Sequence, residues 1–296
     1  MFGFAPQAEK SAPVPSAPVL DLSGHRLRRA FENMVQSAEP TGGVERYITA
    51  LMLKASLFEE LLGKGHIDKL TKEEFLDLAA FVTPVRRRIG QWLADNDFSI
   101  MRQRLIELLM GWSDTASADE RIAGFVASFP ADKAHRWVRD LAAEVLHFTA
   151  PDRYPLMCRW VWDAKVKTGV LREIWHAEDV DAAKIDADDD YLMHSTLSEE
   201  LQGFLAAEGV FRDLPFYTDL LMAHVYAAYI NDRGGQYLRT DFSMEGDPML
   251  HTRRMLGLDA VDTETGRTRL RLIDGQAHFL GGTPALPEPE APRAHS

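Results

Sequence analysis

The sequence predicts an all-α fold, a helical bundle or two packed helical halves, with a small C-terminal β-hairpin. First, apolar residues recur three and four positions apart along most of the chain, which is the period of an amphipathic helix. Second, helix start and stop signals fall at the ends of these periodic segments. Third, one late segment changes to a period of two, which is typical of a strand.

The first half of the chain is predicted to form successive helices from about residue 24. Their apolar stripes fall in the ranges 27–35, 44–62, 75–82, 85–93, 100–112 and 134–148. Thr71 with Glu74 and Ser117 with Glu120 have the spacing of capping boxes, in which each side chain bonds to the other residue's backbone N–H. Pro84 fits the first turn of a further helix, with Thr83 as its expected N-cap.

The second half continues in the same way up to Gly257. Predicted helices cover about 155–169, 196–209, 214–230 and 248–257. Thr196 with Glu199 is the third capping box, and the helix over 214–230 is expected to be apolar on one side, with His224 as a core histidine.

The hairpin is predicted from the segment that follows these helices. Arg267, Arg269 and Arg271 alternate with apolar or β-branched residues, and Asp274–Gly275 supplies a tight turn before a return strand. Strand alternation would place the three arginines on one face.

Composition shifts divide the chain into five parts. These are a flexible Pro/Ala-rich arm (1–20), an N-terminal helical half (21–180), a C-terminal helical half (181–258), the hairpin (259–281) and a Pro-rich tail (282–296).

Charge and cysteine content restrict the function. The 296 residues carry 45 acidic and 33 basic side chains, a formal charge of −12, which disfavours broad binding to a phosphate backbone. The single cysteine, Cys158, excludes an intramolecular disulfide and fits a reducing compartment. Without a signal peptide or an apolar run long enough to span a membrane, we expect a cytoplasmic protein.

No cofactor or metal site is predicted. The acidic run Asp186 to Asp190 lacks the Gly and Glu that a calcium-binding loop needs at its sixth and twelfth positions, so it is interpreted as a solvated linker. Methionines beside His194, His224 and His251 share no spacing that would indicate a copper site. Glycine-rich phosphate loops and the GxSxG motif are absent.

The segment 147–163 is the densest group of polar and aromatic residues. It resembles, over about twenty residues, a helix–turn–helix passage of helical DNA-repair proteins, which carry an aspartate shortly after the second proline. Cys158 stands near that place here, so no catalytic residue is carried over. The favoured interpretation is a rigid aromatic-packed corner, and the alternative is a site with His147, Asp152 and Arg153 as candidate catalytic residues.

Two sets of residues are candidates for binding. The first is the hairpin stripe of Arg267, Arg269 and Arg271, which either meets an acidic partner or protects an exposed sheet edge. The second lies in the polar loop 231–245 and comprises Arg233, Gln236, Tyr237, Arg239 and Asp241.

These observations favour a soluble helical accessory or adaptor protein that binds a protein partner without catalysis of its own. The first alternative is an enzyme with a polar site between the helical halves, formed by His147, Asp152, Arg153 and the 231–245 loop. The second is nucleic-acid binding through local arginine patches. The sequence predicts neither the partner's identity nor the oligomeric state.

Overall fold

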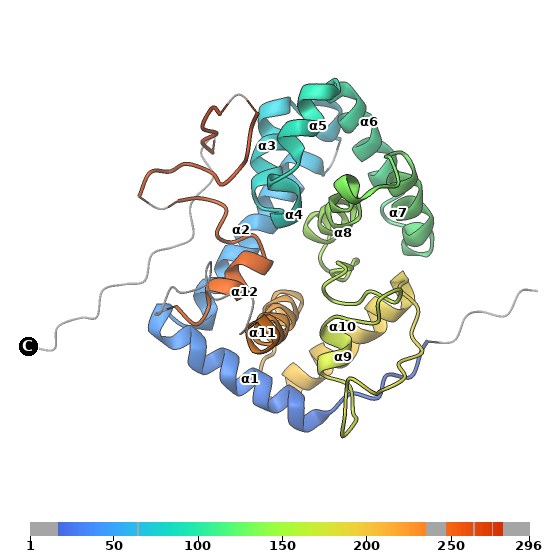
Figure 1. Cartoon of the computed structure of the whole chain (residues 1–296), viewed down its shortest axis with the longest axis vertical. Helices are drawn as coiled ribbons and strands as arrows, with labels where there is room; N and C mark the ends of the chain where they lie inside the picture. The colour runs from blue at the N-terminus through green and yellow to red at the C-terminus, as the bar shows by residue number, and fades with distance from the viewer. Residues whose placement is uncertain (1–16, 64, 235–246, 263, 274, 281–296) are drawn as a thin grey trace, which may run out of the picture.

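Figure 1 shows a computed structural model of the chain, which describes residues 17–63, 65–234, 247–262, 264–273 and 275–280. The side chains of 232–234 lie outside this description. Twelve α-helices occur in the described part: α1 (Gly24–Ala38), α2 (Val44–Leu62), α3 (Lys72–Ala80), α4 (Thr83–Arg86), α5 (Ile89–Asp95), α6 (Phe98–Leu109), α7 (Ala118–Ala127), α8 (Trp137–Thr149), α9 (Val170–Glu173), α10 (Tyr191–Ala207), α11 (Leu214–Gly234) and α12 (Leu250–Met255). The predicted helical class is confirmed for these residues.

Helices α3 to α7 gather at one end of the molecule, and α1 with α9 to α11 at the other (Figure 1). Helix α2 contacts a central helix of each group: α8 packs on α2, α4 and α7, while α11 packs on α1, α2, α9, α10 and α12. The buried apolar residues form one cluster that draws on both predicted halves of the chain. The position of a boundary between those halves stays a prediction.

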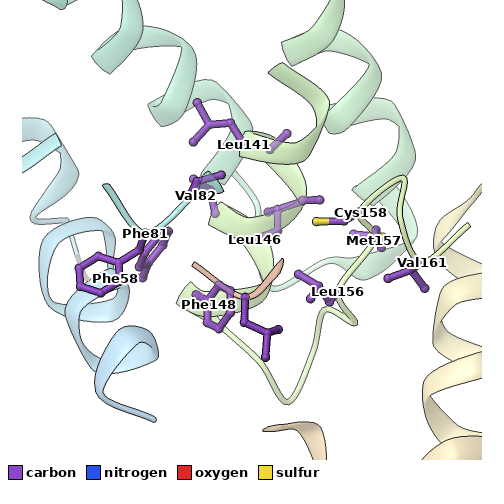
Figure 2. Packing of buried hydrophobic residues seen from close by; sticks show 14 of the residues in the cluster. Phe58, Phe81, Val82, Leu141, Leu146, Phe148, Leu156, Met157, Cys158 and Val161 are labelled. Atoms are coloured by element: carbon purple, nitrogen blue, oxygen red, sulfur yellow. The ribbon is translucent and has the colours of Figure 1, made fainter. Parts of the chain in front are cut away.

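Helix α8 lies at the centre of the core. Figure 2 shows its Leu141, Leu146 and Phe148 between Phe58 and Phe81 on one side and the segment 156–161 on the other. The rings of Phe58 and Phe148 lie 5.6 Å apart at a tilt of 52°. Nearly every residue of α8 is buried, including polar ones, so the helix is an internal element rather than a surface amphipathic helix.

Helix α11 is also internal, which corrects the expectation that it is apolar on one side only. Consecutive residues from Thr218 to Val225 are buried, and five other helices cover them. The prediction of a core histidine in this helix is confirmed: His224 Nε2 lies 2.8 Å from Asn33 Oδ1, and Nδ1 lies 3.2 Å from Thr252 Oγ1.

Of the three predicted capping boxes, only Thr71 with Glu74 is confirmed. Thr71 Oγ1 accepts from the Glu74 N–H at 3.2 Å, and the Glu74 carboxylate accepts from the Thr71 N–H at 2.7 Å. The Ser117–Glu120 box is wrong, because the Ser117 hydroxyl donates to the Asp114 carbonyl instead of capping α7.

The Thr196–Glu199 box is wrong because α10 begins five residues earlier. The Asp190 carboxylate accepts from the Met193 N–H at 2.8 Å and caps the helix at that point. Thr196 therefore lies inside α10, where its hydroxyl donates to the Leu192 carbonyl. The interpretation of the acidic run as a solvated linker is corrected as well, since Asp189 is partly buried and pairs with Arg139.

The predicted helix after Pro155 does not form. Residues 155–169 contain only turns, a bridge and irregular backbone, and residues 156–158 are all buried. The chain instead crosses the core in turns and makes one antiparallel bridge between Asp163 and Thr168. Because α8 is not followed by a second helix here, the passage is not a helix–turn–helix.

The structure does not support the predicted C-terminal hairpin. Two isolated bridges, Val261 with Thr268 and Arg267 with Phe279, take the place of a ladder in the described residues. The predicted alternation of exposure is nevertheless present, since Thr268 and Leu270 are buried while the arginines between and beside them are exposed.

The ladder fails because neighbouring backbone groups of this segment bond in different directions. The Thr268 N–H donates to the His278 carbonyl and the Arg269 N–H to the Ala260 carbonyl, both at 2.8 Å. The Arg271 N–H donates to the Arg86 carbonyl, at the end of α4, at 2.9 Å. The segment is thus attached to the helical body and not to one partner strand.

The chain is attached to the body directly after the predicted N-terminal arm. Leu22 bridges with Trp175, and the His176 N–H donates to the Asp21 carbonyl at 2.8 Å. Leu20 packs against the core. Residues 1–16 and the predicted tail from 282 onward lie outside the described residues.

Candidate anion-binding site

Three basic segments that are far apart in the sequence meet at one place on the molecule. They are 86–87 in and after α4, Arg254 in α12, and 269–271 in the C-terminal segment. The backbone bond from Arg271 to Arg86 holds the first and third segments side by side. We call Arg86, Arg87, Arg254, Arg269 and Arg271, together with Asp259, the arginine cluster.

Asp259 lies at the centre of the arginine cluster. Arg86 Nη1 and Nη2 donate to its two carboxylate oxygens at 2.8 and 3.0 Å, and both side chains are buried, at 4% and 5% exposure. Arg254 Nε lies 3.7 Å from Asp259 Oδ2, and Arg269 Nη1 lies 3.8 Å from it. Arg86 makes two charge-assisted hydrogen bonds to the Asp259 carboxylate, whereas Arg254 and Arg269 lie farther from it. The carboxylate therefore compensates the charge of these two arginines less than that of Arg86.

The arginine cluster contains more positively than negatively charged side chains. Burial alone raises the pKa of Asp259, but its hydrogen bonds with Arg86 and the surrounding positive charges outweigh burial and hold that pKa below its usual value. Burial lowers the pKa of Arg87, and the positive charges of three other arginines of the cluster lower it further. Because positive charges surround Arg87 in this way, an added anion beside it would relieve their repulsion.

The exposed guanidinium groups of the arginine cluster have the chemistry to bind an anion. Arg87 and Arg271 are exposed, and neither side chain makes a hydrogen bond within the described part of the chain. Planar guanidinium groups match the geometry of carboxylate and phosphate groups. Asp259 is buried whereas Arg87 and Arg271 are exposed, so an anion that arrives from solvent meets guanidinium groups rather than the carboxylate.

The predicted binding residues lie in different parts of the chain. Arg269 and Arg271 belong to the arginine cluster, whereas Arg267 is exposed and bonds through its backbone to Asp262. Arg233 lies in the last turn of α11, which extends beyond the predicted end at residue 230. Gln236, Tyr237, Arg239 and Asp241 lie outside the described residues.

The structure separates the candidate catalytic residues. His147 is buried on α8, where Nε2 lies 2.7 Å from Asp219 Oδ2 and Nδ1 lies 2.7 Å from the Tyr154 carbonyl. Asp152 and Arg153 are exposed and line a different place, a surface groove of about 580 Å³ beside α10. His147 does not line that groove, so the three side chains do not form one site.

The structure also reveals polar residues that the sequence reasoning missed. Asp140, Glu144 and His147 occupy one face of α8 at helical spacing, and each is buried and paired. Lys54 Nζ donates to Glu144 Oε2 at 2.6 Å. The sequence does contain a signal for them, because polar residues at positions i, i+4 and i+7 of a largely apolar helix lie on one face of that helix.

Asp140, Glu144 and His147 of α8 each pair with another side chain of the protein. Burial lowers the pKa of His147, but the charge and hydrogen bond of Asp219 outweigh burial and raise it. Burial raises the pKa of Glu144 despite the neighbouring ammonium group of Lys54. We therefore assign these residues to the packing of the core, since a buried charge needs a partner.

No family model, curated protein or solved structure matches the chain. In the part that the structure describes, no helix is both long enough and apolar enough to span a bilayer. Within the same residues, no three His, Cys, Asp or Glu side chains are grouped so as to hold a metal ion. The arginine cluster and the pockets are therefore the features of the molecule that bear on its function.

Proposed function

We propose that this chain is an accessory protein whose arginine cluster binds an acidic segment of a protein partner. The observation that carries the proposal is the pair of exposed guanidinium groups of Arg87 and Arg271, which make no hydrogen bond among the described residues, while Arg86 already occupies both carboxylate oxygens of Asp259. A carboxylate-rich segment supplies the acceptors that Arg87 and Arg271 lack among the described residues. The lone buried thiol, Cys158, is consistent with a cytoplasmic location.

The overall charge favours a short acidic segment over a long polyanion. With a formal charge of −12, the molecule repels an extended phosphate backbone at most of its surface. The arginine cluster is a local exception, so it attracts negative charge only where the partner touches it. Such complementarity contributes more to the rate and specificity of association than to raw affinity.

The test is a binding titration with a defined acidic probe. A fluorescein-labelled peptide of eight glutamates is titrated with the wild-type protein and with the R87Q/R271Q double variant, at low and at physiological salt. The R267Q variant is the matched control, because Arg267 is exposed on the same segment but lies outside the arginine cluster. Circular dichroism and thermal melts establish that both variants fold.

We expect the double variant to bind the peptide at least about fivefold more weakly, with a smaller salt dependence, because two cationic contacts are lost. The R267Q variant should bind as the wild type does. Cross-linked capture from native lysate should then yield a partner that the wild type and R267Q retain and the double variant loses. Equal peptide binding by all three proteins would refute the proposal, as would tighter binding of an eight-nucleotide single-stranded DNA of similar charge.

A further inference from the structure

A second site, separate from the arginine cluster, lies among α5, α6, the end of α7 and the start of α8. It is a pocket of about 700 Å³, within the size range of small-molecule sites. Its aromatic wall is built around Phe129, whose ring centroid lies 5.7 Å from that of Trp92 and 5.6 Å from that of Trp137. His135 adds a fourth ring at 6.4 Å.

Arg104 extends from α6 over this aromatic wall. The carbon of its guanidinium group lies 4.0 Å from the Phe129 ring centroid and 5.8 Å from that of Trp92. The side chain is partly buried, and burial lowers its pKa. The aromatic faces compensate for part of the lost hydration of this cation.

The guanidinium of Arg104 has no hydrogen-bond acceptor among the described residues. Arg102, on the same helix and also stacked on a phenylalanine, donates to the Leu70 carbonyl at 3.2 Å. Arg121 donates to several acceptors, including the Leu108 carbonyl at 2.8 Å. A partly desolvated guanidinium with unused donors, directed along the wall of a pocket, has the chemistry of an anion-binding group.

The other polar groups of the pocket favour an anionic ligand. Arg88 lines the pocket and is exposed. Asp95, the one carboxylate among the described lining residues, already accepts from Gln91 Nε2 at 2.8 Å. His135 Nδ1 is engaged by Asp132 at 2.8 Å, which leaves two guanidinium groups against one carboxylate along the lining.

We propose that this pocket binds a small organic anion with a flat apolar body. The anionic group, a carboxylate or a phosphate, accepts from Arg104, and the flat body packs against the rings of Trp92, Phe129 and Trp137. Because these three rings are themselves largely buried, the pocket lacks the open stacking surface that a nucleic-acid strand uses. A small ligand fits these features best.

The test is a calorimetric titration of the full chain with four probes: benzoate, phenyl phosphate, benzyl alcohol and inorganic phosphate. Tryptophan fluorescence gives a second readout, since Trp92 and Trp137 line the pocket. Three variants are compared with the wild type. R104Q removes the proposed anion contact, R102Q is the matched control on the same helix, and A134W fills the pocket from an exposed lining position.

We expect benzoate or phenyl phosphate to bind the wild type, and the same probe to bind R102Q with the same affinity. That probe should bind R104Q at least tenfold more weakly than it binds the wild type. A134W should abolish binding while leaving the melting temperature unchanged, because residue 134 is exposed. Benzyl alcohol and inorganic phosphate should bind at least tenfold more weakly, because each lacks one half of the proposed ligand. The proposal is overturned if no probe binds at millimolar concentration, if R104Q or A134W binds like the wild type, or if benzyl alcohol or inorganic phosphate binds as well as benzoate and phenyl phosphate do.

Discussion

Arg86 donates to both carboxylate oxygens of Asp259, at 2.8 and 3.0 Å, although the two residues lie 173 positions apart in the chain. This pair joins the short helix α4 to the segment that follows α12. The backbone bond from Arg271 to Arg86 reinforces the same junction. The pair therefore positions the arginine cluster as well as neutralising two buried charges.

Replacing Asp259 with Ala should lower the free energy of unfolding by about 3–5 kcal/mol, because it leaves the buried guanidinium of Arg86 without a counter-charge. The R86M/D259L double variant should lose less than D259A, because it removes both buried charges. Urea unfolding measures both values. As a control, E208Q breaks the exposed pair with Arg28 and should leave the urea midpoint nearly unchanged. A double variant less stable than D259A would show that the pair itself stabilises the fold.

Cys158 should be unreactive in the native protein. It is fully buried beside Met157 (Figure 2), and burial raises the pKa of its thiol well above the usual value, with the charges of Glu144 and Asp140 adding to this effect. Because the thiolate is the reactive form, a thiol reagent such as DTNB should modify one group per chain in guanidinium chloride and none on the same time scale in buffer. Rapid native modification at neutral pH would mean that the 156–161 segment opens.

His224 should make the protein less stable in mild acid. Burial lowers its pKa to about 4, so the folded state holds the neutral ring while the unfolded state takes up a proton near pH 6.5. The stabilisation is therefore fully present above pH 6.5 and is lost as the pH falls toward 4, by on the order of 3 kcal/mol in total. Urea midpoints of the wild type should fall over this range.

The H224Q variant isolates this effect, because Gln is uncharged and can still donate to Asn33 Oδ1. Its urea midpoint should fall less steeply between pH 7 and pH 4 than that of the wild type. His147 acts in the opposite direction, since its raised pKa favours the folded state at lower pH. An identical slope in H224Q and the wild type would rule out His224 as the source of the acid sensitivity.

The sequence was sufficient for the helical class and for elements whose signals are local. The Thr71–Glu74 box depends on residues three positions apart, and the structure contains it. Thr196 and Glu199 have the same spacing, yet Asp190 caps the helix earlier and decides its start. A local motif is thus insufficient when another capping side chain precedes it in the chain.

The arginine cluster could be predicted only in part. The alternation of Arg269 and Arg271 with buried residues is local and is present in the structure. Their approach to Arg86 depends on backbone bonds across the fold, which no spacing in the sequence encodes. The pocket around Phe129 was missed for the same reason, because its rings come from α5, α8 and the connection between α7 and α8.

Gly257 lies so close to the backbone of Phe81 that a side chain at position 257 would clash with it. Gly257 has φ +72°, and a Cβ atom there would lie 1.7 Å from the Phe81 carbonyl oxygen. That oxygen also accepts from Lys54 Nζ at 3.1 Å. Lys54 is buried and donates to Glu144 and to the Leu256 carbonyl as well, so its ammonium group is fully satisfied only while the Phe81 carbonyl stays in place.

Replacing Gly257 with Ala should therefore cost more than about 3 kcal/mol, because the left-handed backbone strain adds to a displaced carbonyl that leaves a buried ammonium group short of one acceptor. The matched control is G209A, since Gly209 has φ +95° and open space where its Cβ would lie. It should cost only about 1–2 kcal/mol, the strain alone. Thermal and urea unfolding of both variants measure the difference. Equal losses would mean that the Phe81 carbonyl moves freely and that the bonds of Lys54 do not depend on its position.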